Sequence, residues 1–229
     1  MCTVVVRWAP QQPVLVLALR DELTDRAFDD PGAWWPQHPG VIGGRDRTAG
    51  GSWCVTDLAA GVSALVLNRP QRREAAPGAP SRGVLPLLAV QHGRDWPGRL
   101  DLTGMASFAL VLITPQELVL WVFDGERLSA SELPAGTHMV TSGGAEDGKA
   151  GRHLLDFTAH GTAEQWRAAV TGTPPQDDLA ALVVRHERDG LVFATVFGQV
   201  FESTPGRLSL SSSRTPWLAD SWREERFEA

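Results

Sequence analysis

The stretch MCTVVVRWAPQQPVLVLALRDE, residues 1–22, decides the fold. It holds two runs rich in valine and leucine, residues 3–8 and 14–19, joined by a short loop that contains prolines. Neither run alternates cleanly between apolar and polar residues, which is typical of strands buried on both faces. Such strands need a sheet that is covered by another sheet and by helices. Pairing of the two runs through this loop brings Arg20 and Asp21 beside Cys2.

Further segments extend this pattern along the chain. Strands are predicted at residues 52–56, 62–67, 107–114, 117–123, 179–186, 191–197 and 207–211. Two hairpins are predicted, one turning at residues 114–117 and one at Asp189-Gly190. Helices are predicted at residues 82–92 and 163–170, the second with Thr162 as its N-cap. We therefore predict the α+β class, with mainly antiparallel sheets in a single domain spanning residues 1–229.

Five other segments are predicted to be irregular. Residues 75–81 and 142–151 are rich in glycine and proline or in glycine alone, which favours loops. The glycine pairs in residues 43–46 and 49–53 are read as turns that lead into a strand, because no helix start follows them to bind a phosphate. Residues 222–226 are read as part of an exposed polar tail.

Composition and charge exclude several classes of protein. The chain has 229 residues, of which 43% are hydrophobic and 21% charged, so it can bury a substantial core and is not intrinsically disordered. The net charge of -6 provides no positive field for nucleic acid, and we expect no nucleic-acid partner. No apolar run approaches the roughly 20 residues that span a bilayer. The interrupted N-terminal apolar stretch fits a signal peptide poorly, so we expect a cytoplasmic protein.

The counts of individual residue types are less specific. Lys149 is the one lysine among 21 basic residues, and we read this imbalance as codon bias. Cys2 and Cys54 cannot form a disulfide framework, and both are expected to be thiols. The histidines show no metal-ligand spacing, so we expect no metal and no cofactor. A single axial ligand to haem, from Cys2 or one histidine, stays open.

Cys2 is the position with the clearest chemical potential. Removal of Met1 would leave one residue that carries both a thiol and a free α-amine. An α-amine has a pKa of about 7.7 to 8.0, so near neutral pH part of it is uncharged and can accept the thiol proton. Arg20 would hold the thiolate, and Asp21 would hold the α-ammonium or orient a substrate. Local spacing alone favours the simpler reading, an ordinary second residue beside a solvated strand end.

Several short motifs together resemble the NRDE family, which includes the Transport and Golgi organisation 2 group. The resemblance covers about the first third of the chain and is diffuse after that. It is carried by Met1-Cys2, Arg7-Trp8-Ala9-Pro10, Leu15 to Glu22, Trp35-Pro36, Gly43-Gly44-Arg45-Asp46, Ala49-Gly50-Gly51-Ser52-Trp53, Asn68-Arg69 and Ser81-Arg82-Gly83.

The resemblance implies a fold and a site. The fold is that of the N-terminal-nucleophile hydrolases, a four-layer αββα sandwich with two mainly antiparallel sheets. In the cysteine branch of that superfamily, the N-terminal cysteine attacks a non-peptide amide. The matching catalytic positions here are Cys2, Arg20 and Asp21, with Asn68 as the candidate oxyanion donor. Trp8, Trp35, Arg45 and Trp53 are candidates for substrate binding, and simple packing is an equal alternative for Arg45 and Trp53.

Three departures from the family pattern remove polar groups. Leu19 replaces the first residue of the Asn-Arg-Asp-Glu motif, Ser142 follows Val140-Thr141 where the family has Leu-Ser-Asn, and Asp178-Leu179-Ala180-Ala181 replaces a Thr-Arg-Ser-Ser type segment. They suggest a divergent or non-hydrolytic member.

Two functions follow as alternatives. The first is an N-terminal-cysteine amidohydrolase or acyltransferase for a small amide or acyl substrate, including a specialised biosynthetic enzyme. The second is a non-catalytic binding or trafficking protein for a hydrophobic ligand such as haem, acyl-CoA or a lipid. The sequence does not decide the oligomeric state.

Overall fold

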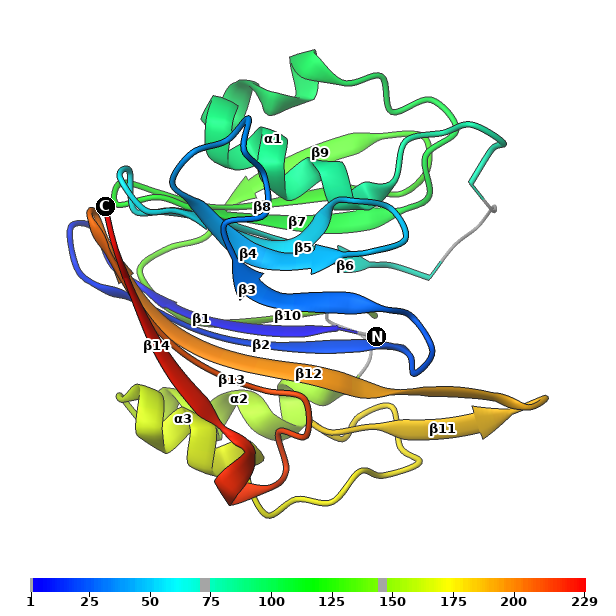
Figure 1. Ribbon diagram of the computed structural model, residues 1–229, viewed down its shortest axis with the longest axis vertical. Coiled ribbons are helices and arrows are strands. Elements are labelled where there is room, and N and C mark those ends of the chain that lie inside the picture. Colours follow the sequence, from blue (N-terminus) through cyan, green and yellow to red (C-terminus); the bar gives the residue numbers. More distant parts are fainter. Residues whose placement is uncertain (1, 71–74, 144–147) are drawn as a thin grey trace. The chain divides into compact units, whose positions relative to one another are not determined.

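A computed structural model describes residues 2–70, 75–143 and 148–229 (Figure 1). Met1 and part of the predicted loop at 142–151 lie outside the described residues, so the proposed removal of Met1 has no structural counterpart here. The chain divides into two compact units. The first contains residues 1–25, 135–203 and 208–227, and the second contains residues 26–134, 204–207 and 228–229.

The first unit is built on a seven-stranded sheet with the order β10-β1-β2-β12-β13-β14, in which β11 also pairs with β12. The pairs β10–β1, β1–β2, β2–β12 and β11–β12 are all antiparallel. Helices α2 and α3 pack on one face of this sheet (Figure 1). The elements are β1 (Thr3–Trp8), β2 (Val14–Leu23), β10 (Gly136–Thr141), α2 (Lys149–Ala159), α3 (Ala163–Val170), β11 (Arg185–Arg188), β12 (Leu191–Thr204), β13 (Arg207–Ser213), η4 (Ala219–Ser221) and β14 (Arg223–Glu228).

Aromatic residues of the two helices form the centre of the core in this unit. Phe157 of α2 and Trp166 of α3 are fully buried and meet edge to face, with ring centroids 5.5 Å apart. The indole N–H of Trp166 donates to the carbonyl oxygens of Phe157 and His160, so the buried polar atom is satisfied. These rings pack on side chains of the sheet that include Leu17 and Val200.

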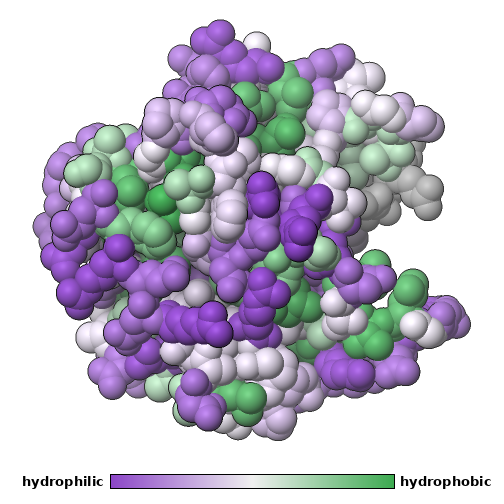
Figure 2. Space-filling model, viewed as in Figure 1, coloured by the Kyte–Doolittle hydropathy of each residue, from purple (hydrophilic) through white to green (hydrophobic). Residues whose placement is uncertain are grey.

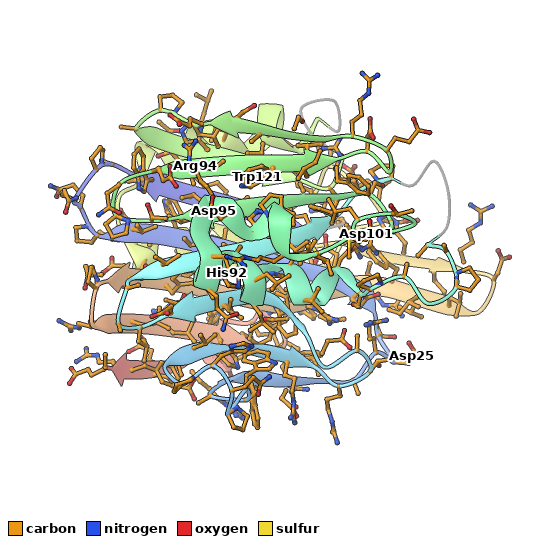
Figure 3. All side chains as sticks on the ribbon, turned by 90° about the horizontal axis from the view of Figure 1, so that it is seen from above. Asp25, His92, Arg94, Asp95, Asp101 and Trp121 are labelled. Atoms are coloured by element: carbon orange, nitrogen blue, oxygen red, sulfur yellow. The ribbon has the colours of Figure 1, made fainter. Side chains whose placement is uncertain are left out.

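The second unit is an antiparallel meander of seven strands in the order β3 to β9. Helix α1 packs against β5, β6 and β7 on one face of it (Figure 1). Trp96 of η2 is fully buried and contacts Trp121 of β8, which Figure 3 labels. The elements are β3 (Phe28–Gly32), β4 (Val41–Asp46), β5 (Ser52–Asp57), β6 (Val62–Asn68), η1 (Arg82–Val84), α1 (Leu85–His92), η2 (Gly93–Arg99), β7 (Phe108–Ile113), β8 (Leu118–Phe123) and β9 (Leu128–Glu132).

The predicted class is confirmed: two mainly antiparallel sheets, each with helices on one face. Both predicted hairpins form, and the second turns at Asp189 and Gly190 with positive φ at both residues, as a two-residue turn of type I′ requires. The helix over residues 163–170 has the predicted boundaries. Its cap is a complete capping box, in which Thr162 and Gln165 each bond the other's backbone N–H.

Four local predictions are wrong. Residues 179–184 are not a strand, because Asp178 holds a turn through the N–H of Ala180, and β11 begins only at Arg185. Residues 43–46 lie in strand β4, whose two glycines face Val55 and Trp53 so closely that no side chain would fit. The predicted polar tail contains β14, an edge strand. Its side chains are mostly exposed, so its sequence lacks the apolar residues that would indicate a paired strand. The predicted loop 142–151 contains the start of α2.

Hydrophobic residues on the visible face in Figure 2 form separate small areas among hydrophilic ones. The large hydrophobic side chains that are exposed are Trp34, Leu155, Leu179, Leu191 and Leu218. Within the described residues, no helix has the length and apolar character needed to cross a bilayer.

We predict that Thr162→Ala lowers the free energy of unfolding by about 1 kcal/mol, because the N–H of Gln165 loses its acceptor at the start of α3. Urea unfolding followed by circular dichroism measures this. Thr158→Ala is the matched control, since the Thr158 hydroxyl bonds a carbonyl inside α2 and alanine favours that position. Equal midpoints for the wild type and Thr162→Ala would contradict the role of the capping box.

Candidate functional site

Cys2 lies at the edge of β1, held between two neighbouring strands. The antiparallel register pairs Thr3 with Leu19 of β2 on one side and with Thr141 of β10 on the other. Just beyond β10, Ser142 donates its backbone N–H to the Cys2 carbonyl oxygen at 3.2 Å. The Cys2 backbone nitrogen in turn donates to Ser142 Oγ at 2.8 Å. The backbone of Cys2 is therefore fixed by main-chain and side-chain bonds.

The Cys2 thiol faces the end of β2. Its Sγ lies 3.9 Å from the backbone oxygen of Asp21, and the residue is partly exposed. Burial of the sulfur raises the pKa of the Cys2 thiol, the negative charge of Asp21 raises it further, and Arg20 opposes the rise. The thiol is therefore protonated at neutral pH and needs a base to react. Cys54, in β5 of the second unit, is buried.

Asp21 is a buried carboxylate with an organised set of partners. Its side chain is 2% exposed, and its Oδ1 accepts the Thr195 hydroxyl at 2.6 Å. Burial raises the pKa of Asp21, while Lys149 and Thr195 favour the ionised form. Strand β12 carries a bulge between Thr195 and Phe197, opposite Asp21 and Arg20. Bulges of this kind re-aim side chains and are frequent beside functional sites.

Lys149 is the second charged group beneath Cys2. It is the first residue of α2 and is fully buried, with Nζ 3.0 Å from the Thr3 hydroxyl and 3.9 Å from Asp21 Oδ2. A buried ammonium is costly unless it is paired and hydrogen-bonded. Asp21 and Thr3 provide this compensation, and the pair anchors α2 to the start of β1.

Arg20 is also buried, at 4% exposure, with Nη2 3.7 Å from the Glu22 carboxylate. Successive residues of a strand point to opposite faces, so Arg20 and Asp21 flank Cys2 from the two faces of the sheet. In the described ranges, no cluster of three His, Cys, Asp or Glu side chains is placed to hold a metal ion.

The other predicted site residues lie elsewhere. Trp8 is buried at the far end of β1, about 20 Å of extended strand from Cys2. The remaining four belong to the second unit. Asn68 is the exposed last residue of β6, and Trp35 is buried with its indole N–H on the Gly50 carbonyl. Arg45 pairs with Asp29, and Trp53 packs edge to face on Phe28. Their roles in substrate binding or oxyanion stabilisation stay predictions.

Sequence reasoning missed three residues around Cys2. Ser142 is noted there only as a loss of the family asparagine, yet its hydroxyl accepts the Cys2 N–H. Thr195 lies in a predicted strand, and no motif in the sequence around it indicates a functional residue. The sequence does single out Lys149, because it is the one lysine in a chain whose other basic residues are arginines. A lysine ammonium and an arginine guanidinium are not interchangeable.

The fold and this site define a class: an α+β protein of two mainly antiparallel sheets, with a cysteine at position 2 over a buried aspartate–lysine pair. The family model described as Transport and Golgi organisation 2 matches residues 1–165. The chain therefore belongs to the Transport and Golgi organisation 2 family, and the match extends well past the first third, where the motifs are clearest. A search of curated proteins finds no match.

We predict that Lys149→Met lowers the free energy of unfolding at pH 7 by about 3 kcal/mol, because the Asp21 carboxylate loses its buried cation. The pKa of Asp21, already raised in the folded state, rises further in the variant. An acid with a raised folded-state pKa stabilises the fold in acid and loses this contribution as the pH rises through that pKa. The deficit is therefore smallest in acid and largest near neutrality, as urea unfolding at several pH values would measure.

Two further variants make this test specific. Lys149→Met combined with Asp21→Asn removes both charges and recovers most of the loss. Arg152→Met is the matched control in the same helix, because its pair with Asp178 is exposed and contributes little to stability. A Lys149→Met deficit that is independent of pH and unchanged by Asp21→Asn would contradict the buried pair.

Proposed function

We propose that the protein is an N-terminal-cysteine amidohydrolase or acyltransferase, with Cys2 as the nucleophile. The observation that carries the proposal is the position of the Cys2 nitrogen, 2.8 Å from Ser142 Oγ, next to a thiol at the edge of a sheet. Once Met1 is removed, that nitrogen is an α-amine. A residue that holds nucleophile and base together needs no separate catalytic histidine.

Ser142 orients this base. One N–H of the α-amine donates to Ser142 Oγ, which leaves the nitrogen lone pair available to the thiol proton. The raised pKa of the Cys2 thiol makes such a base necessary, since little thiolate forms unaided. The α-amine has a pKa of about 7.7 to 8.0 and is partly uncharged at neutral pH.

The buried charges below Cys2 complete the site. Asp21 stabilises the ammonium that forms when the α-amine takes the proton, and Lys149 and Thr195 favour the ionised form of Asp21 against the burial that raises its pKa. Arg20, whose charge favours the thiolate, supports the attacking sulfur. These roles follow the family resemblance for Arg20 and Asp21 and the described contacts for Lys149 and Thr195.

The reaction proceeds through a thioester. The sulfur attacks the amide carbonyl carbon, the thiol proton moves to the α-amine, and Asn68 is our candidate donor to the oxyanion. The C–N bond then breaks, and the leaving amine takes the proton from the α-ammonium. Water attacks the thioester in a hydrolase, or another nucleophile does so in a transferase, and Cys2 is regenerated.

One observation favours the second candidate, a non-catalytic binding protein for a hydrophobic ligand such as haem or an acyl chain. Leu19, at the position of the family's asparagine, is 1% exposed and packs in the core of the first unit. It offers no polar atom to a reaction intermediate. The experiment below separates the two candidates.

We predict that the purified protein lacks Met1 and that iodoacetamide labels Cys2 much faster than Cys54, which is buried and serves as an internal control. The labelling rate rises with pH through the titration of the α-amine. Intact mass and peptide mapping measure both. Cys2→Ala then abolishes turnover in a screen of small amides. Retained Met1, or equally slow labelling of both thiols, would favour the binding protein.

We predict that Ser142→Ala slows alkylation of Cys2 about fivefold, because the α-amine loses the acceptor that orients it, worth roughly 1 kcal/mol. Ser142→Thr keeps a hydroxyl and restores most of the rate. Ser129→Ala, in exposed strand β9, is the matched control. If Ser142→Ala reacts at the wild-type rate across the pH range, Ser142 has no part in activating the thiol.

A further inference from the structure

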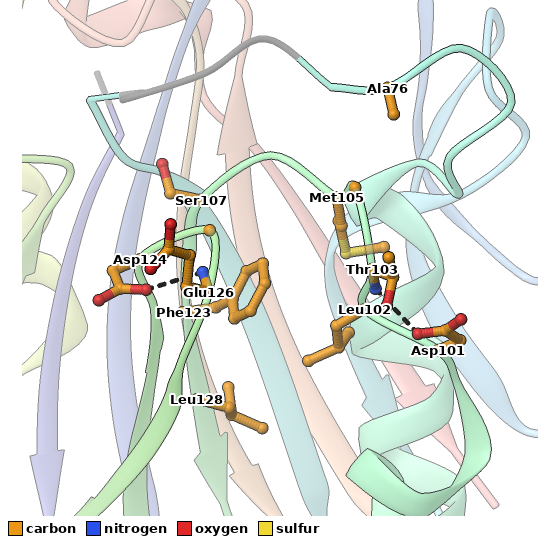
Figure 4. A pocket seen from close by; sticks show the side chains of 12 residues that line it. Ala76, Asp101, Leu102, Thr103, Met105, Ser107, Phe123, Asp124, Glu126 and Leu128 are labelled. Atoms are coloured by element: carbon orange, nitrogen blue, oxygen red, sulfur yellow. Dashed lines mark hydrogen bonds between the residues drawn. The ribbon is translucent and has the colours of Figure 1, made fainter.

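The second unit contains a cavity of about 620 Å³, which lies within the range of small-molecule sites, roughly 300–1,000 Å³. The described residues that line it all belong to this unit. One wall comes from the segment that follows η2 and the other from the ends of β8 and β9. Figure 4 shows Leu102 and Met105 on one side, facing Phe123 and Leu128 on the other. Apolar side chains therefore face each other across the cavity.

The first wall is fixed by a tight turn. Asp101 Oδ1 accepts the N–H of Thr103 at 2.9 Å. The Met105 N–H donates to the carbonyl oxygen of Leu102 at 3.0 Å, which closes the turn. Gly104, within this turn, has a φ of +74°, a conformation that glycine adopts without strain. The backbone that carries Leu102 and Met105 is therefore held in place by its own hydrogen bonds.

The second wall is fixed by the hairpin between β8 and β9. Phe123 and Leu128 are directly opposed residues of this pair, so their side chains share a face. The Asp124 carboxylate holds the turn between them, because its Oδ1 accepts the N–H groups of Glu126 at 2.9 Å and Arg127 at 2.8 Å. Both walls are thus formed before a ligand binds, which lowers the entropic cost of binding.

The Phe123 ring belongs to a row of aromatic side chains. It packs on Phe108 with ring centroids 5.4 Å apart, and Phe108 in turn contacts Trp96 at 6.1 Å. Phe108 and Trp96 are fully buried, so they support the Phe123 ring from the core. Aromatic rings attract other rings beyond the area that they bury, and the sulfur of Met105, on the facing wall, also favours contact with rings. The two walls therefore favour an aromatic ligand over a saturated one of the same size.

We propose that this cavity is a ligand site, which binds an uncharged molecule with an aromatic ring between Met105 and Phe123. Leu102 and Leu128 enclose the rest of its apolar surface. Polar side chains also line the cavity, and an uncharged ligand needs no ion pair with any of them. The inference does not rest on the proposed function, because nothing in it involves Cys2.

The test uses N-phenyl-1-naphthylamine, an uncharged fluorophore whose emission rises in apolar surroundings. It is titrated into the whole protein, and two uncharged competitors then displace it, 2-naphthol and its saturated analogue decahydro-2-naphthol. The two competitors share a carbon skeleton and a hydroxyl, but only 2-naphthol makes ring–ring and ring–sulfur contacts. We expect 2-naphthol to displace the fluorophore at an about fivefold lower concentration.

Variants that fill the cavity locate the binding. Leu128→Trp and Leu102→Trp each add volume from one wall, and we expect each to weaken binding of the fluorophore at least about tenfold. Leu100→Trp is the matched control, because Leu100 is also a half-buried leucine on the same core but is not among the described residues that line the cavity. Met105→Leu conserves the volume, removes the sulfur and reduces the preference for 2-naphthol. Circular dichroism verifies that each variant is folded.

No binding of the fluorophore, an unchanged affinity in both filling variants, or equal displacement by the two competitors would overturn the inference. The result is independent of the labelling of Cys2. Selective labelling of Cys2 without binding of the fluorophore leaves the nucleophile and removes this ligand site. Binding by a protein with an unreactive Cys2 leaves the site and favours the second candidate function, with uncharged aromatic molecules as the ligand class.

Discussion

The first unit depends on one constraint, the placement of the short strand β1 between β2 and β10. This register puts Cys2 between the end of β2 and Ser142. Every functional contact of Cys2 comes from a residue that is distant in sequence. Asp21 is 19 residues away and Ser142 is 140 residues away. A shift of one residue in either pairing would turn the neighbouring side chains to the opposite face and dismantle the site.

The buried pair of Asp21 and Lys149 fixes this register at an energetic cost. Two charges removed from water lose more hydration energy than an apolar pair of similar size, so their presence is weak evidence for stability alone. Their geometry instead positions α2 against the sheet, because Lys149 bonds the Thr3 hydroxyl of β1 and faces Asp21 of β2. An apolar pair would pack in any of several alignments, whereas this pair is satisfied in one.

Local patterns predicted the elements that are defined by their own sequence. Most runs of valine and leucine, the Asp-Gly turn and the threonine cap are signals contained within a few residues, and they form as predicted. The exception is residues 179–184, where a turn held by Asp178 replaces the predicted strand. Two other wrong predictions concern elements defined by distant partners. Strand β14 is polar because it is an edge, and β4 contains glycines because the Trp53 and Val55 side chains approach its backbone. The sequence of either segment alone favours a turn or a tail.

The residues of the site also divide into those indicated by local sequence and those defined by distant contacts. Cys2, Arg20 and Asp21 are found from a motif, because they are adjacent to or at the end of paired strands. Ser142, Lys149 and Thr195 are identified as neighbours of the site by tertiary contact. Lys149 differs from the other two, because composition alone distinguishes it: it is the one lysine in the chain. Arginine supplies the other 20 basic positions, and the one lysine is fully buried, where its compact ammonium bonds the Thr3 hydroxyl and faces Asp21.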